Sequence, residues 1–132
     1  MTTPKLNVFA LIVADMPASL AFYRALGLDI PVSADAEPHV EVALGSGIRL
    51  AFDDVAMVHG FMPSYQPSSG HWGSLAFECS SPGDVDARYD SMRSAGFHGE
   101  MKPWDAFWGQ RYAVLHDPDG NGVDLYSALP TA

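Results

Sequence analysis

Residues 104–126 read WDAFWGQRYAVLHDPDGNGVDLY, and this stretch predicts two β-strands joined by a tight turn. The strands are expected at Gln110–His116 and Gly122–Ser127. The intervening DPDGN is typical of a turn, because proline presets φ while glycine and asparagine tolerate positive φ. We therefore expect a hairpin close to the end of this chain.

The second strand of the hairpin carries an acid in an apolar setting. Alternation along a strand places Asp124 and Tyr126 on one face and Val123 and Leu125 on the other. A carboxylate on the inner face of a strand is costly unless it has a hydrogen-bond partner, a ligand or a metal ion. Asp124 is therefore the first candidate site residue.

Composition narrows the class of protein. The chain has 132 residues, of which 48% are hydrophobic, and this fits one domain with a substantial core. A net charge of −9 argues against nucleic acid or an anionic membrane as a partner and is compatible with a cationic ligand. Cys79 is the single cysteine, so no internal disulfide is possible. The apolar runs are too short to span a bilayer, and no secretory signal is recognisable. A cytoplasmic location is therefore expected.

The chain repeats one pattern twice. Each half is expected to contain a strand, a helix and then three strands. The modules cover about residues 5–55 and 72–128, and a linker without regular structure covers about 56–71. This organisation predicts a single α+β domain of about eight strands with helices on one side.

The predicted helices begin at an acid and end at a glycine. Asp15 is expected to cap the first helix and Gly27 to end it, while Asp84 and Gly96 mark the second helix at the same spacing. The strands outside the terminal hairpin are expected at Leu6–Ala14, Leu28–Val32, Val40–Leu44, Ile48–Phe52, Ser74–Cys79 and Gly99–Lys102.

Four segments carry a resemblance to a known family: LIVAD at 11–15, FYRALGL at 22–28, WGQR at 108–111 and DPDGN at 117–121. With the two βαβββ halves, they resemble the vicinal oxygen chelate superfamily of glyoxalase I, ring-cleaving dioxygenases, fosfomycin resistance enzymes and bleomycin resistance proteins. The resemblance implies a curled mixed sheet of about eight strands, helices on its outer face and a cup-shaped pocket inside. Trp108 and the glycine after it are similar to a motif of the metal-free bleomycin-resistance branch, which the chain resembles most.

The resemblance also implies four metal-ligand positions, which fall on Val8, Arg49, Ser74 and Asp124. Of these, Asp124 alone is a good ligand, whereas a catalytic divalent metal needs about three protein ligands. No metal and no cofactor is therefore expected. His71 or His39 could still supply an unexpected ligand, and this alternative stays open.

Alternation also predicts which side chains line the cup. Its inner face combines small central alanines with polar residues, and the ligand-binding candidates on it are Arg49, Asp53, Ser74, Glu78, Asp124 and Tyr126. Arg49 and Asp124 are expected either to form an ion pair in place of the absent metal or to orient a polar ligand jointly, and the alternative is a purely structural salt bridge. Glu78 and Asp124 are the candidate catalytic residues if the protein is an enzyme.

Aromatic residues are dense just before the terminal hairpin. Trp104, Phe107 and Trp108 lie within five residues, and Trp72 precedes the first strand of the second module. These rings would stack on a flat or cationic ligand, or they would pack in a dimer interface. The two roles are compatible, so both stay open.

We therefore predict a cytoplasmic homodimer that binds or sequesters a small aromatic molecule without a metal ion. The acidic residues of the protein are compatible with a cationic molecule. The expected partners are this small molecule and a second copy, not nucleic acid or a membrane. The alternative is a glyoxalase-like lyase or isomerase, or a dioxygenase, that uses a metal ion or acid–base chemistry. The sequence leaves open the identity of the ligand and whether any reaction is catalysed.

Overall fold

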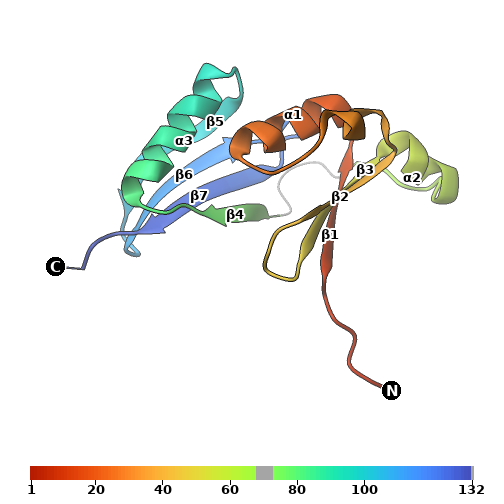
Figure 1. Cartoon of the computed structure of the whole chain (residues 1–132), viewed down its shortest axis with the longest axis horizontal. Helices are drawn as coiled ribbons and strands as arrows, with labels where there is room; N and C mark the ends of the chain where they lie inside the picture. The colour runs from red at the N-terminus through yellow and green to blue at the C-terminus, as the bar shows by residue number, and fades with distance from the viewer. Residues whose placement is uncertain (68–72, 132) are drawn as a thin grey trace. The chain divides into compact units, whose positions relative to one another are not determined.

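The fold is organised in two units. The structure, a computed structural model, describes residues 1–67 and 73–131. The compact units are Met1–Pro67, which combines one β-sheet with helices, and Ser68–Ala132, whose described residues combine one β-sheet with one helix (Figure 1). Each unit follows the order strand, helix, further strands. The predicted α+β class and the two related modules are therefore confirmed.

The sheet of the first unit has three strands in the order β1-β3-β2. β1 (Val8–Val13) runs parallel to β3 (Arg49–Asp54), and β2 (His39–Ala43) runs antiparallel to β3. Phe52 of β3 is fully buried, and its ring packs against Tyr23 with the centroids 5.1 Å apart. This contact joins the sheet to the helix that covers it.

That helix, α1 (Met16–Leu26), has the ends that the sequence predicts. The Asp15 carboxylate accepts a hydrogen bond from the Ala18 amide at 3.1 Å and so satisfies one of the open donors of the first turn. Gly27 ends the helix with a φ of 123°, a conformation that L side chains rarely adopt. Both predicted boundaries are confirmed.

The strand predicted at Leu28–Val32 is wrong. The guanidinium of Arg24 donates to the carbonyl of Ile30 at 2.8 Å, and Pro31 has no amide proton to contribute to a ladder. A short 3-10 helix (Val32–Ala36) follows instead. The apolar segment at Leu28–Val32 is therefore a connection, and the Arg24 side chain of α1 holds it in place.

Helix α2 (Val55–Phe61) lies where the sequence predicted a linker without regular structure. The Asp54 carboxylate accepts a hydrogen bond from the Ala56 amide at 2.8 Å and caps this helix. Val58 is the one buried residue of the helix. Seven residues with one buried side chain give too little apolar periodicity to predict a helix.

The sheet of the second unit has four strands in the order β4-β7-β6-β5. β4 (Ser74–Glu78) runs parallel to β7 (Gly122–Ala128), while β6 (Gln110–His116) is antiparallel to both β7 and β5 (His98–Ala106). The predicted terminal hairpin is confirmed. In its turn, the Asp117 carboxylate accepts two backbone amide hydrogen bonds.

Helix α3 (Pro82–Ser94) packs against β5, β6 and β7. Its N-cap is Ser81, whose hydroxyl accepts a hydrogen bond from the Asp84 amide at 3.1 Å, so the prediction that Asp84 caps the helix is wrong. The Asp84 carboxylate instead pairs with Arg88 one turn later, at 3.0 Å. The apolar side of the helix is buried as predicted, through Val85, Tyr89 and Met92.

The prediction of one curled sheet of about eight strands is wrong. The described residues hold seven strands in two separate sheets, because the segment at Leu28–Val32 does not pair. The predicted alternation holds in the hairpin, where Val123 and Leu125 are buried in the core. A pocket that would join the two modules stays a prediction.

Candidate functional site

Polar and aromatic side chains share one face of the sheet in the second unit. Val123 and Leu125 face the core with α3, so alternation turns Asp124 to the other face. The strand register also aligns a row across that face, formed by Glu78, Tyr126, Tyr112 and Trp104. Asp124 lies one row away from these residues.

Asp124 is a buried carboxylate on this face, with 8% of its surface exposed. Its Oδ2 atom accepts a hydrogen bond from the Ser74 hydroxyl at 3.0 Å and another from the Tyr112 hydroxyl. None of the ion pairs among residues 73–131 includes Asp124. Two neutral donors thus hold the carboxylate in place, and within this unit they leave its charge uncompensated.

Aromatic rings gather around Tyr112. Its ring stacks on Tyr126 with the centroids 6.4 Å apart, and Trp104 and Trp108 meet it edge-on at 5.5 and 5.3 Å. Phe107 adds an edge contact to Trp108 at 5.1 Å. We call these five residues the aromatic cluster. Trp104 lies beyond the strand predicted at Gly99–Lys102, but it belongs to β5, which extends further than predicted.

Sequence reasoning missed Tyr112, because its apolar neighbours made the whole segment resemble core. The alternation of side chains along the strand could have identified it. Ala113 and Leu115 are fully buried in the core, so Tyr112 faces the opposite side of the sheet together with Gln110. Burial, and then the hydrogen bond to Asp124, raise the pKa of the Tyr112 hydroxyl. The phenol therefore stays protonated and donates to Asp124 at neutral pH.

The structure collects most of the predicted site residues on this one face. Ser74 and Asp124 are hydrogen-bonded to each other, and Trp104, Phe107, Trp108 and Tyr126 belong to the aromatic cluster. Glu78 is exposed at the end of β4, opposite Tyr126. Their use by a ligand stays a prediction.

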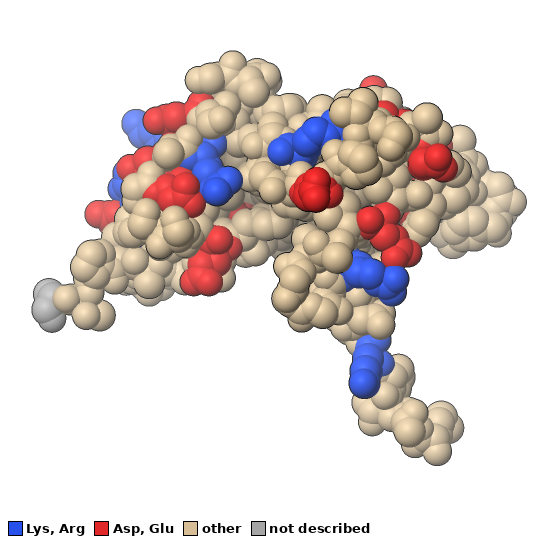
Figure 2. All heavy atoms as spheres, viewed as in Figure 1, with Lys and Arg blue, Asp and Glu red and all other residues tan. Residues whose placement is uncertain are grey.

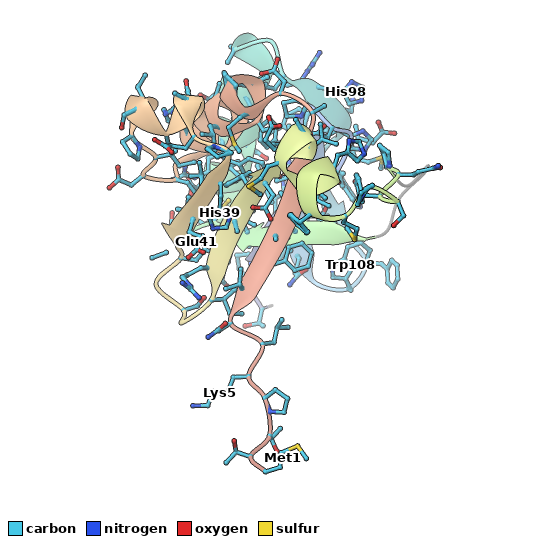
Figure 3. All side chains as sticks on the ribbon, turned by 90° about the vertical axis from the view of Figure 1, so that its right-hand side faces the viewer. Met1, Lys5, His39, Glu41, His98 and Trp108 are labelled. Carbon is cyan, nitrogen blue, oxygen red and sulfur yellow. The ribbon has the colours of Figure 1, made fainter. Side chains whose placement is uncertain are left out.

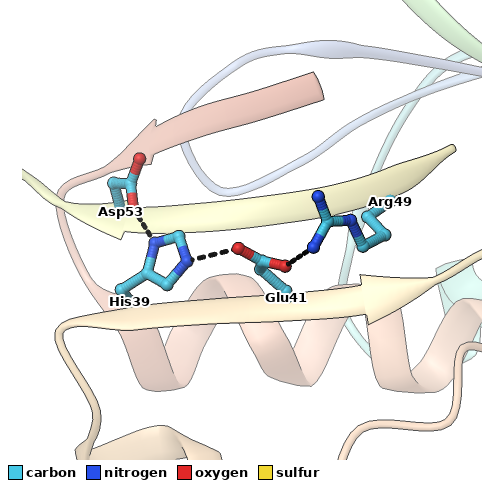
Figure 4. A network of polar contacts seen from close by, with 4 residues as sticks. All are labelled: His39, Glu41, Arg49 and Asp53. Carbon is cyan, nitrogen blue, oxygen red and sulfur yellow. Dashed lines mark hydrogen bonds and ion pairs between the residues drawn. The ribbon is translucent and has the colours of Figure 1, made fainter. Parts of the chain in front are cut away.

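Arg49 and Asp53, the other predicted site residues, lie in the first unit in a polar network on β2 and β3 (Figure 4). His39 contacts Asp53 through Nδ1 and Glu41 through Nε2, the latter at 2.8 Å. Arg49 donates to the other oxygen of Glu41 at 2.6 Å. The predicted ion pair of Arg49 with Asp124 would join residues of different units and stays a prediction.

The carboxylates of this network raise the pKa of His39 above its ordinary value of 6.5, with the Asp53 hydrogen bond as the largest cause. We expect Asp53→Asn to lower this pKa further than Glu41→Gln does, as measured by NMR titration of the ring protons. The network stabilises the fold fully below pH 6.5, and this contribution is lost as the pH rises through the raised pKa. An Asp53→Asn variant with an unchanged His39 pKa would contradict the assignment of the Asp53 hydrogen bond as the largest cause of the raised pKa.

The four positions at which the resemblance implies a metal ion do not fit one. Val8 has no donor atom, and the Arg49 guanidinium is a cation paired with Glu41. Ser74 uses its hydroxyl to donate to Asp124. Asp124 is thus the one position of the four with a suitable ligand group.

Two histidines were left open as metal ligands by the sequence. His39 is hydrogen-bonded to carboxylates through both of its ring nitrogens. His71 lies outside the described residues, as does Trp72 of the predicted aromatic residues. His39 is therefore held by carboxylates of its own unit, and a metal-ligand role for either histidine stays a prediction.

Charged side chains are interspersed on the surface. Within each unit, the Lys and Arg side chains visible in Figure 2 are interspersed with Asp and Glu. With a net charge of −9, the long-range field attracts cations more than anions. Among the described helices, none is long and apolar enough to cross a membrane.

Solved structures share this fold. A glyoxalase/bleomycin resistance protein/dioxygenase from Nocardioides matches with a TM-score of 0.76 and 24% identity, over 100% of this chain and 88% of its own. A family enzyme of the same description from Burkholderia phytofirmans PsJN matches with a TM-score of 0.83 and 20% identity, over 96% and 100%. A protein from Agrobacterium tumefaciens solved by NMR matches with a TM-score of 0.72 and 27% identity, over 98% and 100%. No curated protein sequence gives a significant match.

Fold and site define a two-module α+β protein with a sheet face lined by polar and aromatic side chains. The family model of the glyoxalase/bleomycin resistance protein/dioxygenase superfamily matches residues 5–125. The chain belongs to this superfamily, as its sequence motifs predicted. Because one such fold hosts both binding proteins and enzymes, the function has to be argued from the site.

Proposed function

We propose that the protein binds a small, flat aromatic cation on the sheet face of the second unit, without a metal ion. The observation that supports this most is the buried carboxylate of Asp124 beside the aromatic cluster. A carboxylate without a cationic partner attracts a cation, and aromatic faces add stacking and cation–π attraction. Such binding needs no bond chemistry, so it suits sequestration of the kind that the bleomycin-resistance branch implies.

Exposed rings support this proposal. Phe107 is 97% exposed and Trp108 is half-exposed, although the two lie in contact. Large apolar side chains that lie together on a surface mark binding sites more often than scattered single ones do. A ligand, the second copy of a homodimer, or both would cover these rings.

The second candidate is a glyoxalase-like lyase or isomerase that uses acid–base chemistry. The network around His39 favours it, because an imidazole held by two carboxylates can accept and return protons near neutral pH. Glu78 and Asp124 are the further acid–base candidates. A metal-dependent dioxygenase has less support, since the four implied metal positions do not fit.

Trp108→Ala tests the proposed binding. We expect it to weaken the binding of N-methylquinolinium or phenyltrimethylammonium about 5- to 30-fold, which corresponds to about 1–2 kcal/mol of lost ring contact. Isothermal titration calorimetry in the presence of a chelator measures this, because metal-independent binding is unaffected by chelation. As a control, Phe61→Ala removes an exposed ring of the first unit and should leave the affinity unchanged.

Three results would count against the proposal. Wild-type protein that binds neither probe at about 1 mM would overturn it. Equal affinities of wild type and Trp108→Ala would remove the aromatic cluster from the site. Binding that disappears with the chelator would favour the metal-dependent enzyme instead.

A further inference from the structure

A separate set of metal-ligating side chains lies on β5 and β6 of the second unit. His98, Glu100 and His116 each offer one ligand atom, and these atoms all lie within 4.8 Å of one another. We propose that they form a binding site for Zn²⁺ or a similar divalent transition-metal ion. None of the three is among the four positions tested above.

The strand register brings these residues together. His98 of β5 lies directly opposite His116 of β6. Glu100 lies at an irregularity in the pairing of the two strands, and its carboxylate contacts both imidazole rings. Gly99, between His98 and Glu100, faces α3 so closely that an added Cβ would lie 2.2 Å from the Tyr89 hydroxyl oxygen. Because Gly99 packs this closely on α3, the flanking His98 and Glu100 lie on the face of β5 that points away from α3.

The distances are close to those of a coordinated ion. His98 Nε2 lies 2.8 Å from Glu100 Oε2, and His116 Nδ1 lies 3.7 Å from the same oxygen. Tetrahedral zinc with bonds of about 2.0–2.2 Å separates neighbouring ligand atoms by about 3.3 Å. Small side-chain rotations would therefore suffice to place all three atoms around one ion.

The ligand types also fit. Two imidazoles and one carboxylate form a ligand set that binds Zn²⁺ and its neighbours, and three protein ligands leave a coordination position open. His116 is the least exposed, with 19% of its side chain accessible, while His98 is 61% exposed. The site thus has one partly buried ligand, His116, and two exposed ligands whose side chains can rotate toward the ion.

The proposed metal site and the aromatic cluster occupy different parts of the same sheet face. Along β6, His116 lies four residues from Tyr112, a separation of about 13 Å. Figure 3 shows His98, the first residue of β5, well apart from Trp108, which lies in the turn after that strand. A metal ion can therefore bind without displacing the aromatic ligand, so this inference does not depend on the proposed function.

Calorimetric titration of tag-free, chelator-treated protein with Zn²⁺ tests the proposal. We expect one ion per chain, and we expect His98→Ala to weaken binding at least about tenfold. Because His98 is largely exposed, this variant should fold normally, as circular dichroism would show. Glu100→Gln keeps the side-chain size and should also weaken binding, which gives a second variant if the first does not fold.

Two matched controls separate this site from the rest of the chain. His59→Ala removes a histidine whose ring contacts the Tyr65 carbonyl in the first unit, and it should leave the zinc affinity unchanged. Asp124→Asn should leave it unchanged as well. The proposal is wrong if wild-type protein binds no zinc, if His98→Ala and Glu100→Gln bind it as tightly as wild type, or if Asp124→Asn abolishes binding.

Discussion

Replacing Asp124 with asparagine is expected to weaken the binding of a cationic aromatic probe about 10- to 100-fold. The substitution removes the charge and keeps the shape. Because the Asp124 carboxylate accepts hydrogen bonds from Ser74 and Tyr112, an asparagine carbonyl oxygen can still accept them. Two opposite charges about 6–12 Å apart attract each other by about 1.4–2.8 kcal/mol at an effective dielectric constant of about 20, and a loss of this size corresponds to the expected change in affinity.

A neutral probe distinguishes charge from shape. Quinoline is uncharged at neutral pH and resembles N-methylquinolinium in size, so its weaker binding should change little in Asp124→Asn. Asp90→Asn is the matched control, because it removes the same charge from an exposed position on α3. Equal losses in Asp90→Asn and Asp124→Asn would assign the effect to the net charge of the chain rather than to this carboxylate.

The same variant separates a binding role from a structural one. If Asp124 served the fold alone, Asp124→Asn would lower the free energy of unfolding and leave the probe affinity intact. We expect the reverse, because both hydroxyl donors keep an acceptor while the ligand loses its counter-charge. Urea denaturation and calorimetry on the same samples measure the two quantities.

Local chemistry made the terminal hairpin predictable, whereas tertiary contacts made other elements unpredictable. Proline, glycine and asparagine fix the turn after His116 whatever surrounds it, and alternation then assigns Val123 and Leu125 to the core. The segment at Leu28–Val32 has an equally apolar pattern. It fails to pair because Arg24, on a different element, takes the Ile30 carbonyl, and periodicity contains no information about such a contact.

The candidate site shows the same division. Asp124 stood out from the sequence because an acid within an apolar strand requires a partner. Tyr112 donates a hydrogen bond to Asp124, but its place in an apolar strand made it resemble an ordinary core residue in the sequence. The pairing of His98 with His116 depends on the register of two strands that are irregular between them, so a separation of 18 residues in sequence gave no ligand spacing to recognise.

Phe52→Ala is expected to destabilise the protein by about 3–5 kcal/mol, the largest effect of any substitution proposed for the fold. Phe52 is fully buried in β3, and its ring packs on Tyr23 of α1, so its removal leaves a cavity and breaks an aromatic contact. The midpoint of thermal unfolding should fall by roughly 10 °C or more. Phe61→Ala, at a site that is 70% exposed, should change the stability by less than about 0.5 kcal/mol.

This substitution also tests the prediction that the chain is a single domain. Phe52 belongs to the first unit, whereas all three tryptophans follow residue 67 and report on the second. Each unit alone has a size at which a hydrophobic core is marginal, so we expect the two to unfold together. The tryptophan fluorescence transition of Phe52→Ala should then shift as far as the circular dichroism transition. A fluorescence midpoint that stays at the wild-type value would instead show two modules that fold independently.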